Sequence, residues 1–170
     1  FNKMMNSKVM QRLTDVYQGS DNYWKIYADN FYQGAFNQSF GNAAAIMKQA
    51  KDPAFYAKTG FNNKAEQEFF KNIEDWFSTV AQQKFQRTNA TSGLRKSPVD
   101  AMEEASAYLV TNTIPTYSKV PIIIENIRNL PLGNFIAFPA EILRTSANIV
   151  SIGARELTST NPFIRQMGAR

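Results

Sequence analysis

The sequence predicts an all-α protein, and three observations support that prediction. Apolar residues recur at steps of three and four along most of the chain, the spacing of one face of an α-helix. No stretch alternates apolar and polar residues over the length of a strand. Proline, glycine and capping residues divide the helical pattern into segments. We therefore expect a bundle of about six amphipathic helices, some long and with Pro-marked breaks, that is either compact or extended.

The first predicted helix begins near Val9 and continues past residue 31. Gly19 interrupts it at a cost of about 1 kcal/mol relative to alanine, but the register survives, so we expect one long helix or two nearly collinear ones. We expect its aromatic members to point together into a core, and a poorer amphipathic stretch to follow through Phe40 and Met47. Asp52-Pro53 then marks a turn or a new start. The stripe comprises Leu13, Val16, Tyr17, Ser20, Trp24, Tyr27, Phe31, Gly34 and Ala35.

A second strong helix is predicted over residues 63–87. Its apolar stripe consists of Phe69, Phe70, Ile73, Trp76, Phe77, Val80 and the stem of Lys84. Residues 88–97 (TNATSGLRKS) are polar and contain glycine, which is typical of a linker. We expect this segment to be disordered and to separate a long-helix part, residues 1–87, from a proline-punctuated helical part, residues 98–170.

The third helix has the clearest start signal in the chain. Ser97 can cap it, Pro98 occupies the first helical position, and Asp100 completes a pattern like a capping box. Its apolar face would hold Met102, Ala105, Tyr108 and Leu109. We expect this helix to stop before Pro115.

Three further helices are predicted towards the end of the sequence. Pro121 opens a short one over residues 121–129, and Asn161-Pro162 caps and opens the last. Between them lies a helix that Pro139 should kink or start afresh. The apolar stripe of that helix comprises Phe135, Phe138, Ile142, Thr145, Ile149 and Ile152.

The composition excludes several classes of site. The chain has no cysteine and no histidine, so it lacks disulfides, thiolate nucleophiles, imidazole bases and Cys- or His-ligated metals. Three pairs of neighbouring carboxylates remain: Glu66/Glu68, Glu74/Asp75 and Glu103/Glu104. Residues one or two apart on a helix face different ways, so we read these pairs as solvated helix faces. We predict no catalytic residue, no cofactor and no metal, and hence no enzyme.

The net charge of +5 is modest, but its distribution is uneven. From residue 128 onward every cation is an arginine, a side chain suited to bidentate contact with carboxylate or phosphate. Arg144 can instead pair with Glu141 three residues earlier, or anchor the end of a neighbouring helix. Candidate contacts to a partner or to phosphate are Tyr23, Lys25, Arg144, Arg155 and Arg165.

Amide side chains fill the place that charged ones usually take. The chain contains 16 Asn and 10 Gln among 170 residues, while charged residues make up 19%. Such a surface suits tight packing beside copies or partners. No apolar stretch reaches the roughly 20 residues that a membrane span needs, and membrane contact by amphipathic helices is a further alternative. Both ends look cut from a longer protein.

Four blocks of the sequence together resemble parts of giant "polyvalent" proteins of tailed bacteriophages. They are residues 15–27 (DVYQGSDNYWKIY), 107–121 (AYLVTNTIPTYSKVP), 130–149 (LPLGNFIAFPAEILRTSANI) and 161–170 (NPFIRQMGAR). The blocks cover about a third of the chain, and residues 41–96 have no counterpart. Proteins of this family are often packaged in the virion and ejected with the genome.

The resemblance implies a setting rather than an activity. We expect a structural segment of an internal virion protein, located in the capsid or tail lumen and delivered to the host envelope or cytoplasm. Its partners would be copies of itself or portal, tail and other internal proteins, with contact to genomic DNA also open. One alternative is a nucleic-acid-binding module of a virion-packaged polymerase polypeptide. A further alternative is a membrane-active helical segment of a conduit.

Overall fold

A computed structural model of the chain describes residues 8–49, 51–115 and 133–170, with side chains from residue 22 in the first range and from residue 139 in the last. Every regular element within these ranges is helical, which confirms the predicted all-α bundle of about six helices. The elements are α2 (Lys8–Phe40), α3 (Ala43–Lys48), α4 (Pro53–Thr59), α5 (Lys64–Trp76), η1 (Phe77–Ala81), α6 (Pro98–Thr113), α8 (Gly133–Thr158) and α9 (Pro162–Gly168).

Capping residues set the helix starts where the sequence predicted them. Asp52 accepts hydrogen bonds from the first turn of α4, and Asn161 does the same for α9. At α6 the Ser97 hydroxyl accepts from the Asp100 amide while the Asp100 carboxylate accepts from the Ser97 amide, a complete capping box. This helix ends at Thr113, before Pro115 as expected.

The first helix is a single element through Gly19, as one of the two expected readings had it. It stops at Phe40 because Gly41 adopts a φ of 106°, a left-handed conformation that ends helices. The short α3 then starts at the Asn42 cap.

The second predicted helix ends earlier than expected. The α-helix α5 continues into the wider π-helical turn η1 and stops at Ala81, because Gln82 takes a left-handed φ of 56°. The expected end at residue 87 was therefore wrong, and Lys84 lies outside the helix. The Gln83 amide donates to the Phe77 carbonyl at 2.9 Å, which closes this reversal.

Residues 88–97 form an ordered loop rather than the disordered linker we expected. Asn89 donates from its amide to the Leu94 carbonyl at 2.8 Å, and its side chain accepts from Thr91 at 2.9 Å. Thr88 and Arg95 form an antiparallel bridge. The guanidinium of Arg95 then covers the ring of Phe61 at 4.6 Å, which fastens the loop to the core.

One hydrophobic core draws on residues from both sides of this loop. Trp76 is fully buried at its centre, edge-on to Phe36 of α2 at 5.2 Å and to Tyr108 of α6 at 5.8 Å. Phe77 also lies in the core, as predicted. The core residues are Phe36, Phe40, Ala43, Ile46, Phe61, Phe69, Phe70, Ile73, Trp76, Phe77, Val80, Ala81, Phe85, Ala101, Met102, Ala105, Leu109, Ile152, Ile164 and Met167.

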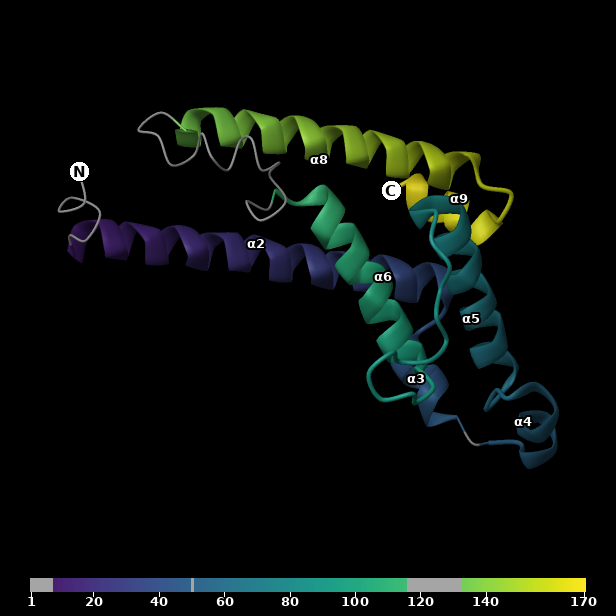
Figure 1. Cartoon of the computed structure of the whole chain (residues 1–170). Helices are drawn as coiled ribbons and strands as arrows, with labels where there is room; N and C mark the ends of the chain where they lie inside the picture. Colours follow the sequence, from purple (N-terminus) through teal and green to yellow (C-terminus); the bar gives the residue numbers. More distant parts are fainter. Residues whose placement is uncertain (1–7, 50, 116–132) are drawn as a thin grey trace.

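The two long helices extend beyond this core (Figure 1). Helix α6 crosses the second half of α2, and α5 and α9 lie at one end of the bundle, away from the first turns of α2 and α8. Helix α8 passes through Pro139 without restarting. The short helix predicted over residues 121–129 and the burial expected for Phe138 lie outside the described residues.

Candidate interaction surface

Helix α2 presents two different apolar faces. The inner face carries Ala28 and Phe36, which are buried in the bundle. The opposite face carries aromatic residues that are 57–64% exposed, namely Tyr23, Trp24, Tyr27 and Phe31. The expectation that Trp24, Tyr27 and Phe31 point into the core was therefore wrong. We call these four side chains the outer aromatic face.

Polar contacts with α6 fix which face of α2 turns inward. The Tyr32 hydroxyl lies 2.7 Å from the Thr113 hydroxyl, and Ser106 hydrogen-bonds to Asp29. Both α2 residues lie on the helix side opposite Tyr27, since successive residues are 100° apart around the axis. Rotating Tyr27 inward would break both contacts and expel Phe36 from its place beside Trp76.

The outer aromatic face is partly ordered by its own ring contacts. Trp24 lies edge-on to Tyr23, with ring centroids 5.7 Å apart, and edge-on to Tyr27 at 6.2 Å. Such edge-to-face pairs are favourable for aromatic rings. The face is thus an organised apolar surface, of the composition typical of interface hot spots.

Helix α8 also turns apolar residues outward. Leu143 and Val150 are among the most exposed hydrophobic side chains of the described part, at 72% and 71%. Of its predicted stripe, Thr145 and Ile152 are buried, whereas Ile142 and Ile149 are exposed. The inner side of α8 instead holds polar groups, including the carboxylates of Glu141 and Glu156.

Glu141 and Arg144 form the predicted pair on one face of α8. Arg144 donates from Nε to the Glu141 carboxylate at 2.7 Å, and Glu141 is almost fully buried. The remaining Oε1 of Glu141 and Nη2 of Arg144 are buried, and neither has a hydrogen-bond partner in the described part of the chain. Arg144 is therefore engaged in an internal contact.

The second arginine of α8 is also engaged internally. Arg155 donates from Nη1 to the Val80 carbonyl at 2.9 Å, so it caps the C-terminal end of η1. It lies about 16 Å from Arg144 along the helix, because each residue advances 1.5 Å. Arg165 of α9 is exposed. Arg144, Arg155 and Arg165 thus do not gather into one cationic site.

The two remaining candidate residues lie on different sides of α2. Tyr23 belongs to the outer aromatic face and is 64% exposed. Lys25 is half-buried and lines a groove of about 440 Å³ between α2 and α6, together with Asp29 and Glu103. Tyr23 and Lys25 therefore do not contribute to one common contact surface.

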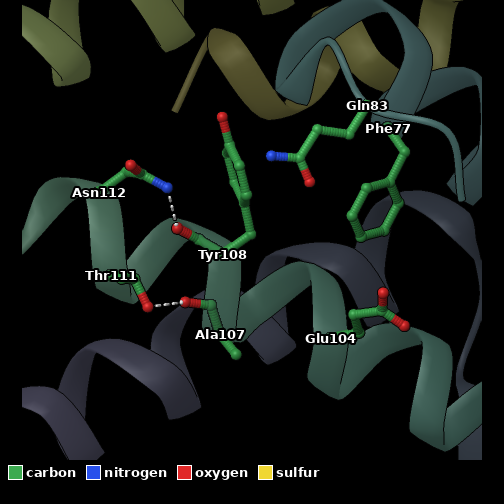
Figure 2. A pocket seen from close by; sticks show the side chains of 7 residues that line it. All are labelled: Phe77, Gln83, Glu104, Ala107, Tyr108, Thr111 and Asn112. Carbon is green, nitrogen blue, oxygen red and sulfur yellow. Dashed lines mark hydrogen bonds between the residues drawn. The ribbon is translucent and has the colours of Figure 1, made fainter. Parts of the chain in front are cut away.

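A second groove, of about 370 Å³, lies on the η1 side of α6 (Figure 2). Glu104, Tyr108 and Gln83 project toward it, and Tyr108 and Glu104 have partners within the chain. The Tyr108 hydroxyl donates to the Ala81 carbonyl at 3.3 Å, and Glu104 pairs with Lys96. The groove offers one carboxylate and no pair of adjacent acid and base groups among its lining residues.

Several members of the carboxylate pairs noted in the sequence make separate structural contacts. Glu74 binds Arg87, and Asp75 accepts from the Asn161 amide at 2.8 Å. Glu66 is buried rather than solvated, which corrects the expectation for that residue. It accepts from the Asn62 amide at 2.7 Å and lies 3.4 Å from Arg95.

The structure shows neither a cation site nor a membrane span in the part it describes. No three acidic side chains lie together there in a manner that could hold a metal ion. None of the described helices is long and apolar enough to cross a bilayer.

No family model, curated protein or solved structure matches the chain. The fold and the exposed surface are therefore the observations that define the class of this protein. The chain is an all-α helical bundle with an exposed aromatic face on its longest helix.

Proposed function

We propose that this chain is a structural segment of an internal virion protein of a tailed bacteriophage, which is packaged in the particle and ejected with the genome. The observation that carries the structural role is the outer aromatic face of α2. Exposed aromatic clusters of this kind are costly in water and are typical of protein–protein contacts. The phage setting comes from the resemblance of the four sequence blocks.

The contacts of Arg144 and Arg155 within the chain also favour a packing role over nucleic-acid binding. A nucleic-acid-binding module needs several cations that can reach phosphates. Arg144 and Arg155 instead bind Glu141 and the Val80 carbonyl. A packing segment needs an uncharged, apolar face, and the outer aromatic face has that composition.

Mass spectrometry of purified particles tests the proposal. Particles of a tailed phage that encodes this sequence should contain its peptides, and particles that have released their DNA should have lost most of them. A major capsid protein peptide, unchanged by release, is the internal control. Full particles that lack the chain would refute the virion role.

Cross-linking within the same particles tests the packing role. Lys25 lies on α2 next to Trp24 in the sequence, but on the side of the helix that faces the α6 groove. A lysine-reactive cross-linker should join it to another protein chain in intact particles. Particles that contain the chain but yield only cross-links within one copy would argue against packing through α2.

A further inference from the structure

The exposed positions of α2 follow the spacing of a coiled-coil seam. Trp24, Tyr27, Phe31 and Gly34 are separated by three, four and three residues, and all four are exposed. This alternation keeps side chains on one line along a helix that faces another helix. In the sequence the same spacing continues backward at positions 20, 17 and 13, which lie within the bounds of α2. The pattern is that of a helix-on-helix contact rather than of a pocket.

The seam is uncharged, which decides between classes of partner. Tyr23 and Asn30 flank it, Gln38 occupies its next position, and all three are exposed and neutral. A strongly acidic or basic partner would find no complementary charge here. A second copy of the same face would bury no charge and meet no like charge. Self-association is therefore the pairing that this surface favours.

The exposed area is sufficient for such a pair. A buried aromatic side chain covers roughly 150–250 Å², and the four members of the outer aromatic face are 57–64% exposed. Together they present on the order of 500 Å² per copy, or about 1,000 Å² for two copies, before flanking residues are included. That total reaches the lower limit for a specific interface.

The position of α2 in the bundle favours antiparallel helices. The second half of α2 is packed against α6 and the core, whereas its first turns extend away from α5 and α9 (Figure 1). In a parallel pair both bundles would crowd the same end. In an antiparallel pair each bundle would lie beside the first turns of α2 in the other copy.

We infer that the outer aromatic face of α2 packs against the same face of a second copy of this chain, with the two helices antiparallel. The inference rests on the proposed function, because it names the partner of the same packing surface. The pair would be isologous, with each copy contributing Trp24, Tyr27 and Phe31.

Sedimentation of the purified chain over a range of concentrations tests the inference. The wild type should dimerise as concentration rises, and Tyr27→Glu should raise the dissociation constant at least about tenfold, since it buries a charge at the centre of the contact. Val150→Glu on the outer side of α8 is the matched control, because Val150 is also highly exposed and the substitution also introduces a glutamate. It should leave the dimer unchanged, and circular dichroism should show both variants folded.

A single introduced cysteine tests the orientation, since the sequence has none of its own. A cysteine at Gly34 meets open space in one copy. Gly34→Cys chains should not cross-link to each other if the helices are antiparallel and cross near Trp24 and Tyr27. Efficient 34–34 disulfides would overturn the antiparallel arrangement.

Two outcomes would overturn self-association itself. One is a chain that stays monomeric at its highest soluble concentration. The other is a dimer that Val150→Glu abolishes and Tyr27→Glu spares. Neither outcome affects the detection of the chain in particles, so the inference and the proposed function can fail separately.

Discussion

Trp76 and Glu156 meet in the centre of the bundle although 80 residues separate them in the sequence. The indole Nε1 donates to the Glu156 carboxylate at 3.0 Å, and both residues are buried. Burial raises the pKa of Glu156, and the hydrogen bond from Trp76 offsets only part of that rise. Burial likewise raises the pKa of Tyr32, and the negative charge of Glu156 adds to it. An acidic side chain thus joins α5 to α8 inside the core.

Glu156→Gln should stabilise the fold at neutral pH and lose that advantage in acid. Because the folded-state pKa is raised, the native state favours the protonated carboxyl. The protonated Glu156 carboxyl stabilises the fold fully below its ordinary pKa of 4.5, and this stabilisation is lost as pH rises through the raised pKa of the folded state. Glutamine keeps an acceptor for Trp76 without the charge. Urea unfolding of both chains at pH 4 and pH 7 measures the difference.

Glu68→Gln is the control for that experiment, because Glu68 is exposed on the same α5 helix that carries Trp76. It should change the free energy of unfolding little at either pH. A Glu156→Gln chain less stable than wild type at pH 7 would show that the buried carboxylate is ionised and stabilising.

Two phenylalanines on opposite faces of α2 should respond very differently to truncation. Phe36→Ala removes a fully buried ring beside Trp76 and should cost about 3–5 kcal/mol. Phe31→Ala removes a ring that is 58% exposed and should change stability by only about 0.5 kcal/mol. Chemical unfolding at low concentration, where copies do not associate, compares them. Equal losses would mean that α2 is rotated differently from the structure.

Local interactions made the helix starts predictable from the sequence. The caps at Asp52, Ser97 and Asn161 each bond to a backbone amide two or three residues away, so the signal and its effect lie together in the sequence. The face that α2 buries could not be predicted in this way. Both faces have helical spacing, and distant residues such as Ser106 and Thr113 choose between them.

The same limit applies to the buried acids and to the candidate site. Glu66, Glu141 and Glu156 look like surface residues in the sequence, and their burial depends on the packing of helices far apart along the chain. The pairing of Arg144 was predictable because Glu141 lies one turn away. The contact of Arg155 with the Val80 carbonyl was not predictable from the sequence, because 75 residues separate the two. The early end of η1 depends on Gln82 adopting a conformation that its residue type does not signal.

Ser97→Ala should destabilise the chain by about 1 kcal/mol, since it leaves the Asp100 amide without the Ser97 hydroxyl. Ser146→Ala, an exposed change within α8, serves as the comparison and should be close to neutral or slightly stabilising. Thermal or urea unfolding of the two variants gives the difference. Similar stability of both would mean that the capping box contributes nothing measurable.

Two helical glycines should respond to alanine with opposite signs. At Gly168 an added Cβ would lie 2.7 Å from the Glu156 Cβ and 2.9 Å from the Leu157 backbone nitrogen, so α9 would have to shift away from α8. At Gly153 the added Cβ meets nothing within 4 Å, and alanine should stabilise α8 by about 1 kcal/mol. Overpacking of the kind expected at Gly168 typically costs about 1–3 kcal/mol. Unfolding midpoints should therefore rise for Gly153→Ala and fall for Gly168→Ala. A neutral Gly168→Ala would show that α9 is held loosely against α8, and the close packing of Glu156 beneath it would then need revision.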